Sequence, residues 1–73
     1  MDTIINILQE INPYVEIDYN THLLEEGILD SIGIMYLITS LEELYDIEIP
    51  GENIIPENFQ DITSIQNLIK VLN

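Results

Sequence analysis

The sequence has no cysteine, and Lys70 is its one basic side chain. Without cysteine the chain can form no disulfide, no cysteine metal site and no thiolate nucleophile, so any thiol chemistry needs an imported thiol. His22 is the one histidine, which leaves a zinc ion without a second nitrogen or sulfur ligand. We therefore expect His22 to be a surface residue of a loop.

Long apolar runs are also missing. No stretch approaches the roughly 20 apolar residues that a membrane-spanning helix needs. The first residues lack the basic region and the cleavage site of a signal peptide. We therefore expect a cytoplasmic protein that does not insert into membranes.

The chain is strongly acidic. Fourteen Asp and Glu residues stand against that single lysine, and the formal net charge is -13. Such a surface repels nucleic acid and anionic lipid, and it attracts proteins that carry basic patches. Simple solubility is the alternative explanation of the charge.

The sequence shows no recognisable combination of catalytic residues. The sequence contains no Ser/His/Asp or Cys/His combination with a plausible arrangement, and clustered carboxylates on exposed helix faces lack the burial that tunes a catalytic pKa. We therefore expect no enzymatic activity of the chain itself.

The length and the apolar content fit one small core. The chain has 73 residues, of which 47% are hydrophobic, and a chain this short buries a limited share of its surface. We expect residues 1–73 to form a single domain and the protein to be a monomer.

Two long helices are predicted in the first two thirds of the chain. The first spans roughly residues 3–12, with Asp2 or Thr3 as its cap and Pro13 as its end. The second runs from Ser31 to about Asp46, with Asp30 as N-cap. Apolar residues recur at helical spacing in both, which predicts their buried faces: Ile4, Ile7, Leu8 and Ile11 in the first, and Ile34, Leu37, Ile38, Leu41, Leu44 and Tyr45 in the second.

Residues 13–30 show no sustained period. A structureless connection of this length is unusual in a small domain, but the segment carries apolar residues that can anchor it across the helices, with one helical turn after Thr21. These anchors are Val15, Ile17, Leu23, Leu24, Ile28 and Leu29.

The last third predicts an extended segment and two more helices. Residues 47–50 leave the second helix in extended form, and a turn follows at Pro50-Gly51. Pro56 suits the first position of a short third helix that carries Phe59. Thr63 and Gln66 form a capping box for the last long helix. The expected fold is an all-α four-helix bundle, with three long helices, one short helix and a long loop between helices one and two.

Ser31 is the candidate functional residue. The predicted boundary places its hydroxyl at the start of a helix, where unpaired backbone N–H groups and the helix dipole stabilise an anion. A phosphodiester on Ser31 would be well placed there. The alternative is that Asp30 and Ser31 only cap the helix, as residues of these types often do.

The wider pattern resembles the acyl carrier protein family over essentially the whole chain. The segment Leu29-Asp30-Ser31-Ile32 is similar to that family's attachment motif, in which Leu, Met or Ile follows the serine. Further similarities lie at the separations from the serine that such proteins show: Leu41-Glu42-Glu43, Tyr45, Glu48-Ile49-Pro50, Phe59 and Thr63.

The resemblance implies a carrier whose Ser31 receives 4'-phosphopantetheine from coenzyme A through a phosphopantetheinyl transferase. The thiol of this arm would hold the cargo as a thioester. The implied partners are a loading ligase and downstream synthase or transferase enzymes with basic patches. The resemblance also implies that the second helix presents the recognition surface, made by Asp30, Ile32, Met35, Tyr36, Glu42 and Glu43.

Several positions depart from fatty-acid carriers. Gly33 stands where those proteins often have a polar or acidic residue, and its presence is more similar to D-alanyl carriers and some other dedicated carriers. Tyr36 and Thr39 also differ from the usual residues. The cargo therefore stays open between fatty acyl, polyketide, aminoacyl and D-alanyl groups. The alternative function is an acidic helical interaction domain without the arm.

Overall fold

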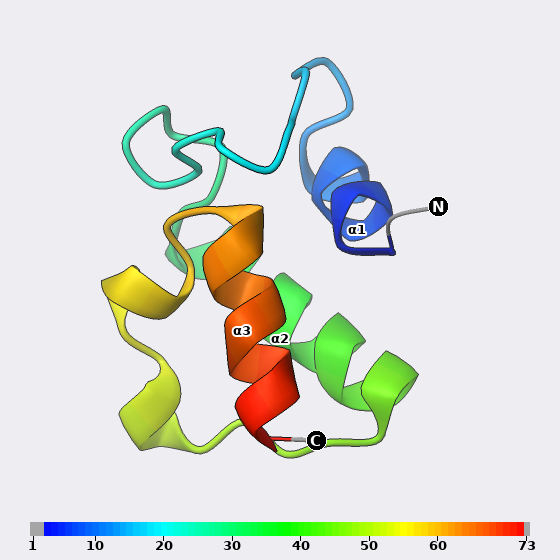
Figure 1. The fold of residues 1–73 in the computed structure, drawn as a ribbon. Helices are drawn as coiled ribbons and strands as arrows, with labels where there is room; N and C mark the ends of the chain where they lie inside the picture. The colour runs from blue at the N-terminus through cyan, green and yellow to red at the C-terminus, as the bar shows by residue number, and fades with distance from the viewer. Residues whose placement is uncertain (1–2, 73) are drawn as a thin grey trace.

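The computed structural model describes residues 3–72, and all regular structure in that range is helical. This confirms the predicted all-α class. The elements, in chain order, are α1 (Thr3–Ile11), α2 (Ser31–Tyr45), the 3-10 helices η1 (Gly51–Asn53) and η2 (Pro56–Asn58), and α3 (Ile62–Leu72). Figure 1 shows the long connection from α1 arching over one end of the molecule to reach the start of α2. No helix in the described range is long and apolar enough to cross a membrane.

The boundaries of α1 and α2 agree with the sequence prediction. α1 ends at Ile11, two residues before Pro13, and α2 begins at Ser31 after the N-cap residue Asp30. Asp2, one of the two predicted caps of the first helix, lies outside the described residues. Both helices contribute their predicted apolar faces, except for Leu44, to one core, which also takes residues from the connection, from the exit of α2 and from α3. The largest of its fully buried side chains is Phe59.

The connection between α1 and α2 is held by its apolar side chains and by backbone hydrogen bonds. Leu23, Ile28 and Leu29 are buried, and the other predicted anchors pack against the core. The Leu23 carbonyl accepts hydrogen bonds from the N–H groups of Ile28 and Leu29 at 2.9 and 3.0 Å. The Glu26 N–H donates to the His22 carbonyl at 3.0 Å, which forms the single helical turn predicted after Thr21. The loop is therefore fixed without a helix of its own.

The exit of α2 is organised by Glu42. Its backbone carbonyl accepts the N–H groups of Asp46 and Ile47, and its carboxylate accepts the Ile49 N–H at 3.0 Å. Asp46 takes the left-handed conformation with φ of 53°, a region that Asp tolerates better than most residues. The chain then reverses, and Ile47 and Ile49 are buried on either side of the exposed Glu48, as expected for an extended segment.

The predicted short third helix is a 3-10 turn. η2 has Pro56 at its first position, as predicted, but it spans three residues, and Phe59 follows it as the C-terminal cap residue. The proline biases Ile55 away from the α region, and Ile55 is extended with ψ of 153°. The Asn58 side chain donates to the Asn53 carbonyl at 2.7 Å and joins η2 to η1. Three α-helices and two 3-10 turns thus make up the described fold.

The capping box predicted for the last helix is wrong. α3 begins at Ile62, and the Asp61 side chain accepts the Ser64 N–H at 2.8 Å, so Asp61 is the capping residue. Thr63 lies exposed in the first turn. The earlier start places Ile62 in the first turn of the helix, where it is fully buried.

The predicted burial of Leu44 is also wrong. The sequence pattern placed it on the buried face of α2, yet its side chain is 58% exposed. Leu37 and Leu41 on the same helix are fully buried, whereas Leu44 lies in the last turn, next to the reversal at Asp46. The apolar stripe therefore extends past the part of α2 that the core covers.

Candidate functional site at the start of α2

Ser31 is the first residue of α2, and it is exposed. Asp30 precedes it in extended conformation, and its carboxylate accepts the Gly33 N–H at 2.7 Å. The Asp30 carbonyl accepts the Ile34 N–H at 2.8 Å, the first helical hydrogen bond. Asp30 is therefore the predicted N-cap, and the cap fixes the position of the serine.

The region around Ser31 can accept an anion. Within residues 3–72 neither the Ser31 hydroxyl nor the N–H groups of Ser31 and Ile32 have a hydrogen-bond partner. α2 is 15 residues long, so the positive end of its dipole lies beside these donors. A phosphate ester on the hydroxyl would lie next to free donors, and such donors suit a phosphate. The Asp30 carboxylate opposes the anion, but one of its oxygens is already bound to Gly33.

The chain enters the site through a fixed turn. Gly27 has φ of 74°, a conformation that a side chain would strain. The buried residues Ile28 and Leu29 follow, and both donate their N–H groups to Leu23. Ser31 is thus exposed, but the backbone that leads to it is anchored.

Gly33 is buried where the end of α1 meets the first turn of α2. A Cβ atom at this position would lie 3.3 Å from Asp30 Oδ1, 3.4 Å from Ile11 Cγ2 and 3.4 Å from Leu29 Cδ2. The distance to Asp30 is tighter than usual, and the two distances to carbon lie at the short limit of ordinary van der Waals contact, so a side chain here would crowd the N-cap and touch the end of α1. The departure from fatty-acid carriers that the sequence shows at this position is therefore a packing feature beside Ser31.

The apolar residues predicted for partner recognition lie on the surface of α2. Ile32 is 82% exposed, Met35 is 58% exposed and Tyr36 is 47% exposed. Tyr36 is not isolated, because its hydroxyl donates a hydrogen bond of 2.6 Å to Glu10 Oε1 on α1. This hydrogen bond, together with the negative charge of Glu10, raises the pKa of the Tyr36 hydroxyl above its usual range.

The three acidic residues predicted for recognition differ in their environments. Glu43 is exposed on α2. Asp30 is exposed but also serves as the N-cap. Glu42 is half-buried, and its carboxylate binds the Ile49 N–H. Glu42 therefore has a structural role that sequence reasoning missed, and no local signal could have indicated it.

A groove lies beside Ser31, between the end of α1 and the start of α2. Its volume is about 450 Å³, and its lining residues are Glu10, Ile11, Asp30, Ile32, Gly33 and Tyr36. Sequence reasoning missed Glu10 and Ile11, because they come to α2 only through the packing of α1.

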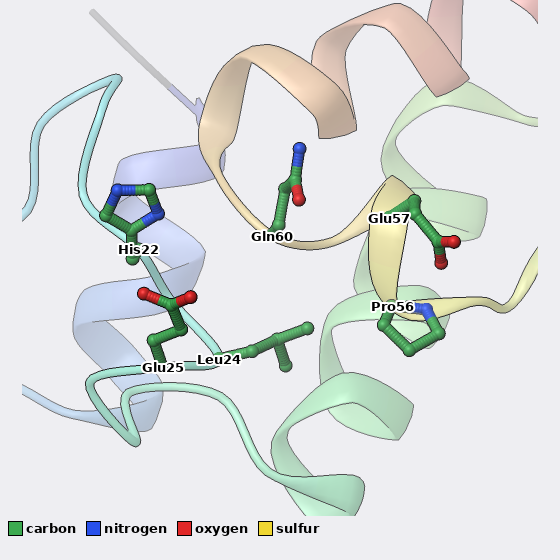
Figure 2. A pocket seen from close by; sticks show the side chains of 6 residues that line it. All are labelled: His22, Leu24, Glu25, Pro56, Glu57 and Gln60. Carbon is green, nitrogen blue, oxygen red and sulfur yellow. The ribbon is translucent and has the colours of Figure 1, made fainter.

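A second hollow, of about 260 Å³, lies between the long connection and η2. Figure 2 shows His22 and Glu25 on the connection, with Gln60 on the segment that leads into α3 and Glu57 pointing away. His22 is exposed on the loop, as predicted. Among the described residues, no three His, Asp or Glu side chains are arranged to hold a metal ion.

Comparison with known proteins identifies similar chains. The family model described as "Phosphopantetheine attachment site" matches residues 2–72. A D-alanyl carrier protein of Listeria welshimeri serovar 6b is 37% identical over 51 residues, a match that covers 67% of this chain and 65% of the relative. A D-alanyl carrier protein of Listeria monocytogenes serotype 4a matches with the same identity and coverage. The match thus spans just under two thirds of the length of these relatives.

Proposed function

The chain belongs to the phosphopantetheine-attachment family of carrier proteins, and on that premise we propose that Ser31 is the residue that carries its 4'-phosphopantetheine arm. One observation carries the assignment: Ser31 is exposed at the start of α2, and its hydroxyl and N–H group have no partner in the described part of the chain. Free donors and the helix dipole favour a phosphate there.

Ser31 supplies the oxygen for attachment. A phosphopantetheinyl transferase joins this oxygen to the pantetheine phosphate of coenzyme A. The phosphoanhydride bond of coenzyme A breaks, adenosine 3',5'-bisphosphate leaves, and the hydroxyl proton is released. The chain contributes an accessible hydroxyl on an anchored backbone, and the arm supplies the thiol that holds cargo as a thioester.

Partner enzymes perform the chemistry in this proposal, and the chain has no catalytic activity of its own. The partners are the transferase, a ligase that loads the cargo, and a downstream synthase or transferase. They dock on α2 through Asp30, Ile32, Met35, Tyr36, Glu42 and Glu43. Glu43 offers its carboxylate freely to a basic patch, whereas Glu42 contributes through the shape of the α2 exit.

An aminoacyl group, of which D-alanyl is the leading candidate, is the proposed cargo. The names of the similar Listeria proteins and the glycine at position 33 support this choice over a fatty acyl or polyketide cargo. We also propose that residues 1–73 form a single cytoplasmic domain of the four-helix acyl-carrier type, in which the two 3-10 turns take the place of the third helix.

The test is the intact mass of the protein after incubation with coenzyme A and a broad-specificity phosphopantetheinyl transferase. We expect a gain of one phosphopantetheine per chain. Ser31→Ala should abolish this gain, while the matched variant Ser40→Ala, on the same helix, should retain it. No gain with several transferases would favour the alternative, an acidic helical interaction domain without the arm.

A further inference from the structure

The groove between α1 and α2 joins two helix ends of opposite polarity. At the positive end of α2 the groove is lined by Asp30 and Ile32, which flank Ser31, and the N–H groups of Ser31 and Ile32 have no partner within residues 3–72. The groove is also lined by Glu10 and Ile11, the last two residues of α1, where the helix dipole is negative. One end of this region therefore suits an anion, and the other suits a cation.

Within residues 3–72, Glu10 forms no ion pair at the negative end. The last turn of α1 contains no basic residue, and Glu10 adds a full negative charge to the dipole. Lys70, the single basic side chain, lies in the last turn of α3. An acidic residue at a helix C-terminus is unfavourable in itself, so a positively charged ligand would relieve the repulsion.

The walls of the groove are suited to a short, partly apolar chain. Ile11, Ile32 and Tyr36 provide apolar surface, and Ile32 directly follows Ser31 in sequence. The Tyr36 hydroxyl donates to Glu10 Oε1. A carboxylate has about four acceptor positions on its two oxygens, so Glu10 can accept a second donor while Tyr36 holds it in place.

We propose that this groove receives the cargo end of the arm and that Glu10 binds a protonated amino group on the cargo. The groove then favours aminoacyl cargo over neutral acyl cargo of the same size. Tyr36 acts as a positioning residue for the Glu10 carboxylate. The proposal rests on the proposed attachment of the arm at Ser31.

The experiment loads the protein with stable amide analogues of the charged arm. One analogue carries an isotopically labelled alanyl group, and a second carries a lactyl group, in which a hydroxyl replaces the ammonium. The pKa of the alanyl amine is measured by NMR at 0.15 M salt. At this ionic strength the Debye length is about 8 Å, so charges farther away than this are largely screened. Backbone amide shifts of Gly33 and Tyr36 report contact of either analogue with the groove.

A nearby carboxylate favours the charged form of an amine. For a solvent-exposed pair, contact with Glu10 should raise the pKa of the amine by about 0.2 to 0.7. Glu10→Gln should remove this increase, and Tyr36→Phe should reduce it. Glu48→Gln, which removes one exposed carboxylate outside the groove, should leave the pKa of the amine unchanged.

Two results would overturn the proposal. Equal pKa values of the amine in Glu10→Gln and Glu48→Gln would show that only the overall negative charge of the protein acts on the cargo. Equal shifts of the Gly33 and Tyr36 amides with the lactyl and alanyl groups would show that the ammonium is not selected. If the protein gains no mass on incubation with the transferase, attachment of the arm at Ser31 is refuted. If the arm is attached normally and either of the two results above is found, the groove proposal alone is refuted.

Discussion

Glu42 and Glu43 are adjacent on α2, and replacing each by alanine separates a structural role from a surface role. The Glu42 carboxylate accepts the Ile49 N–H at 3.0 Å in a half-buried setting, whereas Glu43 is exposed and receives no hydrogen bond within the described residues. Both substitutions remove one negative charge and introduce the same helix-favouring side chain. A difference in stability between the two variants therefore reports the contact with Ile49.

The expected size of the difference follows from this hydrogen bond. Hydrogen bonds to charged groups contribute about 1.5–3 kcal/mol, and partial exposure places this one at the low end. The lost charge relieves some repulsion in a chain of net charge -13. We expect Glu42→Ala to lose about 1–2 kcal/mol of unfolding free energy, which lowers Tm by roughly 5–15 °C in a domain of this size.

The assay is thermal unfolding of the protein without its arm, followed by circular dichroism. Glu43→Ala should stay within about 0.5 kcal/mol of the wild type, as surface substitutions usually do. Glu42→Gln keeps an acceptor oxygen and should recover much of the loss. Equal Tm values for Glu42→Ala and Glu43→Ala would refute the structural role of Glu42.

Two further predictions use pKa shifts. Hydrogen bonds from Ser64 lower the pKa of the Asp61 carboxyl, so the ionised carboxylate stabilises the fold above the unfolded pKa of about 4, and this stabilisation is lost as pH falls through the folded pKa. The Tm difference between the wild type and Asp61→Asn should therefore shrink between pH 6 and pH 3. A constant difference would contradict this. The hydrogen bond to Glu10 raises the pKa of Tyr36, so Glu10→Gln should lower the pKa of Tyr36. The measurement is a pH titration followed by tyrosinate absorbance, in which Tyr36→Phe identifies the Tyr36 signal. An unchanged pKa in Glu10→Gln would exclude the contact.

The features that sequence could predict are those with local signals. The cap at Asp30, the end of α1 before Pro13 and the start of α2 at Ser31 each follow from residue types within a few positions. The anchors of the long connection were also predictable, because apolar residues in a polar segment tend to be buried. The start of α3 was predicted wrongly, because the spacing of Thr63 and Gln66 indicated a capping box and Asp61, a residue type that also favours N-caps, was overlooked. In the structure the Asp61 carboxylate makes the cap hydrogen bond, and Ile62 is buried in the first turn.

The features that sequence missed depend on contacts between distant segments. Glu10 and Tyr36 are 26 positions apart, and their hydrogen bond exists only because α1 packs beside the first turns of α2. The hydrogen bond from Ile49 to Glu42 requires the reversal of the chain at Asp46, where a non-glycine residue takes a left-handed conformation. Neither contact has a spacing that a helix or a strand would produce.

Gly33 links the attachment residue to the groove beside it. Glycine within a helix costs about 1 kcal/mol relative to alanine, and here a side chain would crowd the N-cap. An alanine methyl would lie 3.3 Å from Asp30 Oδ1, the atom that caps α2, and 3.4 Å from Ile11, which lines the groove. A movement that relieves these contacts would shift the cap that holds Ser31, the wall of the groove, or the buried side chain of Leu29, which also lies 3.4 Å away. Gly33 therefore lies between the cap that positions Ser31 and Ile11 in the wall of the groove, so both proposals involve its surroundings.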